Sequence, residues 1–204
     1  HLKCSEKWML RTCAMNKYSL QEHLQEELTP FTSTFKATSY DEEKDEYLCS
    51  DARTPHVYDF DAYVKEHCHH PTPASPDAIH VGSKDLYFVE FKNQFPGTID
   101  KAGMQRKFQD GTRILKNLLQ KFSAKDCEYH FCVVFKNQPK PRYMDFRHVE
   151  NNVVKFGLAE LNRQLGDFYD HVVTESLDFY VKEFKALTCK TEVLTIGNPP
   201  LKPL

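Results

Sequence analysis

Several features that mark common protein classes are scarce in this chain of 204 residues. It has only seven glycines and no glycine-rich loop, which argues against a nucleotide-cradling site. No apolar run approaches the roughly 20 residues needed to cross a bilayer, so we expect no membrane span. The first residues lack a basic segment followed by an apolar one, so we expect no targeting signal. A net charge of −2 gives no global sign of a polyanion partner.

The seven cysteines are an odd number and contain no C-x-x-C spacing, which favours free thiols over a disulfide scaffold. We therefore expect a reducing intracellular compartment such as the cytoplasm, a prediction that delivery into a host or target cell would also satisfy. The tract His67-Cys68-His69-His70 resembles a metal ligand set. Zinc sites need two converging ligand pairs, and without a matching second pair a polar loop is the favoured interpretation.

Charge is unevenly distributed along the chain. Residues 1–75 carry 8 basic and 13 acidic side chains, residues 76–150 carry 13 and 9, and residues 151–204 carry 6 and 7. Such asymmetry can mark a surface that faces a polyanion in the middle third, although a solvated basic helix explains it equally well. The acidic first third could bind a protein partner.

Hydrophobic periodicity predicts a mixed α/β (α+β) domain. A capping box at Ser19 starts a helix over 19–29, and the polar residues 31–55 are expected to form a loop or insertion. Residues 56–64 fit either a strand or a short helix. Further expected elements are a hairpin over 76–94, a basic amphipathic helix over 99–122, a buried strand over 128–136, and helices over 150–172 and 175–188. The predicted organisation is a core over 1–149, a C-terminal helical extension packed on it over 150–190, and a mobile tail over 191–204.

The hairpin PDAIHVGSKDLYFVEFKNQ carries charges where a core hairpin should be apolar. A turn at Gly82–Asp85 pairs residues whose numbers sum to 167, so Asp77 faces Glu90 on one side of the sheet, roughly 5 Å apart between Cβ atoms. Strand alternation places Lys92 on the same side. A register shift of one residue would turn Asp77 away from Glu90.

Two carboxylates that close repel each other unless a positive charge lies between them. Lys92 offsets part of the repulsion, and Mg²⁺ or Mn²⁺ would offset it better, because hard cations prefer carboxylate and carbonyl oxygens. The carbonyl of Phe91 could complete the ligand set of Asp77 and Glu90. A nearby lysine can orient or deprotonate a water, so the pattern suits metal-assisted hydrolysis of a phosphodiester.

Pro76-Asp77, followed after 12 residues by Glu90-Phe91-Lys92 on an apolar strand, resembles the motif of the PD-(D/E)xK nuclease superfamily. The resemblance covers roughly residues 56–136 and implies a restriction-endonuclease-like core, a mixed sheet between helices. It implies that Asp77 and Glu90 bind Mg²⁺ or Mn²⁺ and that Lys92 serves the nucleophilic water. Gln105 matches a glutamine that many members place near the site. A further acid is common, and the rivals here are Glu26, Glu27, Asp59 and Asp61.

The leading hypothesis is therefore a metal-dependent nuclease acting on DNA, or on RNA, with no membrane association. Phosphate contacts are expected from the helix that follows the motif, through Lys101, Arg106, Lys107 and Arg113. His56 or His67 could assist the site. The main alternative is a non-catalytic member of the fold that binds nucleic acid or a protein, and an enzyme acting on a small phosphate or a protein stays open as well.

Overall fold

The computed structural model describes residues 19–68, 71–119, 127–137 and 155–196. Its centre is a five-stranded mixed sheet in the order β3-β4-β5-β6-β7. The strands are β3 (Val57–Asp59), β4 (Ala78–Val81), β5 (Asp85–Lys92), β6 (Glu128–Phe135) and β7 (His171–Ser176). β3, β4 and β5 pair antiparallel, whereas β5, β6 and β7 run parallel. The chain is thus an α+β fold with a mixed central sheet, as the sequence predicted.

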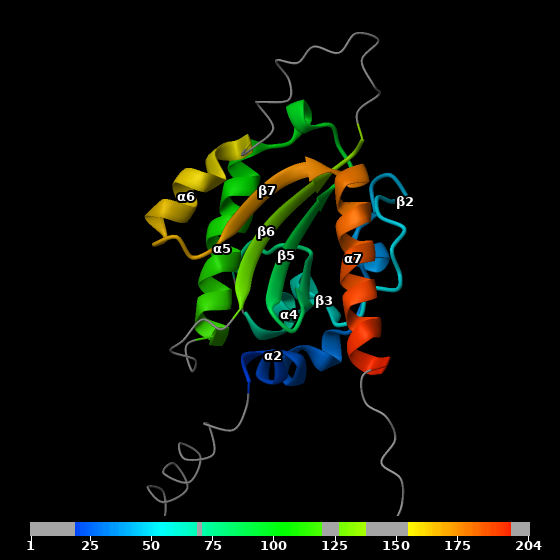
Figure 1. The fold of residues 1–204 in the computed structure, drawn as a ribbon. Coiled ribbons are helices and arrows are strands. Elements are labelled where there is room, and N and C mark those ends of the chain that lie inside the picture. The colour runs from blue at the N-terminus through cyan, green and yellow to red at the C-terminus, as the bar shows by residue number, and fades with distance from the viewer. Residues whose placement is uncertain (1–18, 69–70, 120–126, 138–154, 197–204) are drawn as a thin grey trace, which may run out of the picture.

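Helices cover both faces of this sheet (Figure 1). One face packs against α2 (Leu20–Leu28), α4 (Phe60–His67), α5 (Lys101–Leu119) and α6 (Leu158–Gln164). The other face packs against α7 (Leu177–Ile196) and the short α3 (Phe35–Thr38). Strand alternation assigns the side chains: Phe88 joins the first core, while Val89 joins the second. Every functional side chain on a strand can therefore be assigned to the α5 face or the α7 face.

The local signals of the first half are confirmed. Ser19 and Glu22 form the expected reciprocal capping box at the start of α2, and Leu20, Leu24 and Leu28 are its buried stripe. The hairpin has the expected register, with Ala78 opposite Val89 and Val81 opposite Leu86. The Gly82 N–H donates to the Asp85 carbonyl at 2.8 Å, which closes the turn. Residues 56–64 contain both a strand and the start of a helix, because β3 leads directly into α4.

The second half corrects one prediction. The expected helix over 150–172 is a 3-10 turn, η6 (Lys155–Gly157), followed by the shorter α6 and then by β7. Gly166 and Asp167 have φ angles of 79° and 49°, a left-handed conformation that ends the helix. The β-branched residues after them extend as an edge strand. α7 continues to Ile196, so residues 191–196 of the expected tail are helical, and 197–204 lie outside the described residues.

The polar region 31–55 is more ordered than a loop. After η2 (Thr29–Phe31) and α3 it forms a small hairpin from β1 (Tyr40–Asp41) and β2 (Glu46–Tyr47), with the tyrosine rings 4.9 Å apart. This acidic hairpin, residues 40–47, is anchored on the main sheet. The Lys44 ammonium donates to the Asn93 carbonyl at 2.5 Å, and the Asn93 amide donates to Glu46 at 3.0 Å. The insertion therefore lies at the ends of β5 and β6.

Two further expectations concern cysteines and membranes. Of the described cysteines, Cys49, Cys68, Cys132 and Cys189 are free thiols, and Cys4 and Cys13 lie outside the described residues. Within the described ranges, every helix is too short or too polar to cross a bilayer.

Candidate functional site

The two predicted carboxylates meet where β4 begins and β5 ends. Asp77 immediately precedes β4, and its backbone carbonyl accepts from the Phe60 N–H at 3.1 Å. Its Oδ2 accepts from the Phe91 N–H at 2.7 Å, which ties Asp77 to β5 beyond the last paired residue. Glu90 lies inside β5 with its side chain fully buried. Both carboxylates are on the α5 face, as the register predicted.

Two lysines bind these carboxylates. The Lys92 ammonium lies 2.8 Å from Glu90 Oε1. The Lys107 ammonium, which comes from α5, donates to Glu90 Oε2 at 2.9 Å and to Asp77 Oδ1 at 3.2 Å. Lys107 therefore bridges the two carboxylates. Four side chains, from the residue before β4, from β5 and from α5, form one compact charge cluster: Asp77, Glu90, Lys92 and Lys107.

Burial and the neighbouring charges shift the pKa values of this cluster. Burial, and then the Glu90 carboxylate, raise the pKa of Asp77 to about 7, against the opposing effect of Lys107. Burial alone would lower the pKa of Lys107, but the two carboxylates outweigh it and raise that pKa. Glu90 Oε1 is buried without a well-aligned hydrogen bond, although both ammonium groups lie 2.8 Å from it. The Lys107 ammonium between the two carboxylates offsets part of their mutual repulsion.

The Phe91 carbonyl was the third oxygen donor expected from the sequence, and its direction follows from the strand geometry. The N–H and C=O of one strand residue point to the same side of the strand. Since the Phe91 N–H points to Asp77, the Phe91 carbonyl also faces the Asp77 side of β5. Lys92 shows the opposite orientation, because its carbonyl accepts from the Lys136 N–H on the β6 side at 3.1 Å. The hard oxygen donors of Asp77, Glu90 and Phe91 are thus directed to one region, a set that suits Mg²⁺ or Mn²⁺.

Two surface hollows meet at this cluster. One, of about 320 Å³, is lined by Asp77, Phe91 and Lys92 on the sheet and by residues 38–43 of the acidic hairpin and the segment before it. The other, of about 290 Å³, is lined by Lys92, Lys107 and Arg106 with neighbouring residues of α5. Lys92 and Gln94 border both. The charge cluster therefore opens to an acidic hollow on one side and a basic hollow on the other.

The structure separates the four basic residues predicted to hold phosphate. Lys107 turns into the cluster, and Arg106 lines the basic hollow. Lys101 is exposed at the start of α5. Arg113 lies further along the helix, where it pairs with Asp110 at 2.9 Å. Sequence reasoning missed the position of Lys107, although the signal was present, because Lys107 shares the helical stripe of Met104, Phe108 and Gly111 that faces the sheet.

Gln105, predicted near the catalytic group, points elsewhere. Its amide donates to the Phe156 carbonyl at 2.7 Å and so holds η6 against α5. Residues two positions apart on a helix do not share a face, so Lys107 and Gln105 cannot both turn toward the cluster. In this structure Lys107 faces the carboxylates.

The rival positions for a further acid are also separated. α2, which carries Glu26 and Glu27, lies near the hairpin turn, where Gln21 donates to the Ser83 carbonyl, at the end of β5 remote from Glu90. Asp59 caps α4 by accepting from the Ala62 N–H at 2.8 Å. Asp61 accepts from the Ser75 hydroxyl at 2.7 Å and pairs with Lys65. Burial alone would raise the pKa of Asp61, but Lys65, Ser75 and Lys107 together lower it. Asp61 therefore interacts electrostatically with Lys107 of the charge cluster.

The two predicted assisting histidines lie away from the cluster. The His56 carbonyl accepts from the Val81 N–H, which places His56 toward the hairpin turn. His67 stacks on Tyr63 near the C-terminal end of α4, whereas Asp77 contacts the N-terminal end. Of the histidine-rich tract, His69 and His70 lie outside the described residues.

Gly111 controls how closely α5 approaches the motif. A Cβ at this position would lie 2.6 Å from Pro76 Cδ and 3.1 Å from Pro76 Cγ. Glycine to alanine normally stabilises a helix by about 1 kcal/mol, but here we expect Gly111→Ala to destabilise the protein by about 1–2 kcal/mol, because the Pro76 ring and the backbone of Asp77 must move. Urea denaturation measures the change. Gly97→Ala, where the added Cβ has nothing within 4 Å, is the control, and equal effects of both variants would contradict the packing argument.

Comparison with known proteins adds no family: no family model matches the chain, and no curated protein or solved structure shows significant similarity to it.

Proposed function

We propose that this chain is a metal-dependent nuclease that hydrolyses phosphodiester bonds, with DNA the favoured substrate and RNA the alternative, on a restriction-endonuclease-like core of the PD-(D/E)xK type. One observation carries the proposal: Asp77 and Glu90 converge within hydrogen-bonding reach of a single cation, with Lys92 2.8 Å from Glu90. A position for a cation between two carboxylates suits a divalent metal, which prefers hard oxygen ligands.

The donor set assigns the roles. Asp77, Glu90 and the Phe91 carbonyl would hold Mg²⁺ or Mn²⁺, which supplies a more acidic bound water and shields phosphate charge. Lys107 now takes that position between the carboxylates, and its long side chain also lines the basic hollow, into which it could withdraw. Lys92 would orient the attacking water beside Glu90. Asp61 is the proposed further acid, and Gln105 is assigned to positioning η6.

The two hollows suggest how the substrate approaches. Phosphate oxygens are repelled by the acidic hairpin, whose Asp41, Glu42 and Glu43 line the hollow on one side of Lys92. Arg106 and Lys107 line the hollow on the other side, and Lys101 lies on the same helix. A nucleic-acid backbone would therefore enter over α5 and meet the carboxylates from the basic side. Such phosphate contacts are independent of sequence and weaken with salt.

A second candidate, a non-catalytic module that binds nucleic acid or a protein partner, is favoured by a different observation. Two lysines balance the two carboxylates, so the cluster is neutral without a metal. The exposed acidic hairpin would then be the surface for a protein partner. The two candidates differ in whether a divalent ion is required for activity.

The deciding experiment incubates the EDTA-treated full chain with single- and double-stranded DNA and RNA, with Mn²⁺, with Mg²⁺ or without metal. We expect metal-dependent cleavage, reduced at least about 100-fold in Lys92→Ala because the group beside the attacking water is lost. Lys84→Ala is the matched control, since Lys84 is exposed at the turn of the same hairpin. If the folded wild type binds these substrates but cleaves none of them with either metal, the binding module replaces the nuclease.

A further inference from the structure

A second cluster of possible metal ligands lies on the opposite face and at the opposite end of the sheet. Glu128 and His130 stand at the start of β6, two residues apart and therefore on one side of the strand. His171, the first residue of β7, is the register partner of His130. Their neighbours Tyr87 and Cys132 belong to the α7 face. This cluster is independent of Asp77 and Glu90, which lie on the α5 face where β5 ends.

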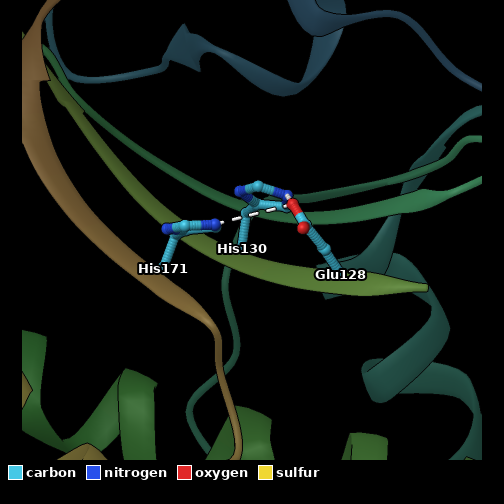
Figure 2. A group of neighbouring side chains, drawn as sticks. All are labelled: Glu128, His130 and His171. Carbon is cyan, nitrogen blue, oxygen red and sulfur yellow. Dashed lines mark ion pairs between the residues drawn. The ribbon is translucent and has the colours of Figure 1, made fainter.

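The nitrogen donors of the two histidines converge on one carboxylate oxygen (Figure 2). Glu128 Oε2 lies 3.5 Å from His171 Nε2 and 3.8 Å from His130 Nε2. Ligands bound at 2.0–2.1 Å to a tetrahedral Zn²⁺ lie about 3.3 Å from one another. The ligand atoms of all three residues lie within 4.8 Å of one another, somewhat wider than such a zinc ligand triangle.

Stacking holds these rings in place before any ion binds. The rings of Tyr87, His130 and His171 form a column across three neighbouring strands, with centroids 4.4 Å and 4.7 Å apart. Tyr87 and His130 are nearly parallel, at 8°. Ligands held in position by such packing lose little conformational freedom on binding.

One donor atom of the cluster lacks the partner that its burial requires. Among the described residues, His130 Nε2 is buried without a hydrogen bond of good geometry, although an Asp85 oxygen lies 3.4 Å away. A buried polar atom without a partner is costly and commonly marks an ion or water that completes it.

We propose that Glu128, His130 and His171 form a zinc-binding site, with Asp85 able to supply a fourth oxygen. Two imidazoles and a carboxylate favour Zn²⁺ over Mg²⁺, which prefers oxygen ligands alone. Glu128 and His171 are 64% and 50% exposed, so the ion can enter from solvent. Bound zinc links β5, β6 and the edge strand β7 at the end of the sheet remote from the charge cluster. This role goes beyond the proposed nuclease and does not depend on it.

The test measures Zn²⁺ binding to the EDTA-treated, reduced full chain by competition with a chromogenic chelator and by thermal unfolding. We expect one equivalent of zinc to raise Tm, with affinity at least about 10-fold lower in His171→Gln and in Glu128→Gln. Both changes are at exposed positions and preserve side-chain size, so the variants should fold. Substituted Co²⁺ should show ligand-field bands without a thiolate charge-transfer band, because the ligands are nitrogen and oxygen.

Two controls distinguish this site from others in the chain. A variant with His67→Gln, Cys68→Ser, His69→Gln and His70→Gln removes the histidine-rich tract, and Asp77→Asn alters the charge cluster. Both should still bind one equivalent of zinc. Zinc binding that persists in the double variant of Glu128→Gln and His171→Gln, or that disappears with the histidine-rich tract, would overturn the proposal.

Discussion

Replacing Lys107 with methionine is expected to lower the free energy of unfolding of the metal-free protein by about 3–5 kcal/mol at pH 8, a size typical of breaking a buried ion pair. The ammonium of Lys107 lies 2.8 Å from Glu90 and 3.2 Å from Asp77, and Glu90 is fully buried. Methionine keeps the length of the side chain but leaves two adjacent carboxylates with Lys92 alone. At about 3 °C per kcal/mol, Tm should fall by about 10 °C.

Divalent ions should reverse this loss, because the vacated position between the carboxylates is the one proposed for the metal. A ligand at 100 times its Kd stabilises a protein by about 2.7 kcal/mol. Mn²⁺ should therefore raise the Tm of Lys107→Met by several degrees. In the wild type the same Mn²⁺ concentration should have a smaller effect, because the ion must displace the Lys107 ammonium.

Two further variants make this result specific. Lys101→Met removes an equal charge from an exposed position on the same helix and should change stability by no more than about 0.5 kcal/mol. Adding Asp77→Asn to Lys107→Met should restore much of the stability and abolish the Mn²⁺ response. If Lys107→Met is as stable as the wild type and Mn²⁺ shifts neither protein, the carboxylates are not a metal site.

The second large effect is a loss of stability in acid that depends on His80, on the interior strand β4. Its side chain is buried, its Nδ1 lies 2.9 Å from the Pro55 carbonyl, and burial lowers its pKa to about 4 from the usual 6.5. Between these values the unfolded chain binds the proton more readily than the native protein does. Stability is therefore lost as the pH falls from about 6.5 to 4, and the difference of about two and a half pH units corresponds to about 3 kcal/mol.

His80→Asn isolates this contribution, because the asparagine amide can replace Nδ1 as a donor to Pro55 but does not titrate. The variant should be somewhat less stable than the wild type at pH 7, owing to its smaller side chain. As the pH falls to 4, the wild type should lose about 3 kcal/mol more than the variant. Urea denaturation at several pH values measures both curves. Parallel curves would show that His80 does not titrate differently in the folded and unfolded states.

Features of the site that depend on residues close together in the sequence could be predicted, whereas features that depend on distant residues could not. The convergence of Asp77 and Glu90 followed from one short turn, because a hairpin register propagates from Gly82 and Asp85 along both strands. The contacts of Lys107 could not be predicted in the same way. Its assignment to phosphate rested on charge, whereas its actual contacts depend on the rotation of α5, which the approach of Gly111 to Pro76 helps to set.

Other features arose from contacts between distant segments. The acidic residues 40–47 were predicted as part of a loop or insertion. They form a hairpin that lies beside the charge cluster, because Lys44 and Glu46 bind Asn93. The helical spacing of apolar residues across 150–172 was misleading, because Gly166 and Asp167 interrupt it and β7 pairs with β6. His130 and His171 are 41 positions apart in the sequence, and only this parallel pairing makes them neighbours.

The sequence by itself determined the local elements of this protein: the capped first helix, the register of the charged hairpin, the basic amphipathic helix and the buried strand after it. Each is set by interactions within a turn or two, or by the alternation of apolar side chains, which a linear pattern records directly. Only the tertiary structure decided which cation bridges Asp77 and Glu90, where the acidic hairpin lies, and that Glu128, His130 and His171 meet. Helix rotation and the pairing of distant strands minimise the free energy of the whole core, and no local pattern specifies them.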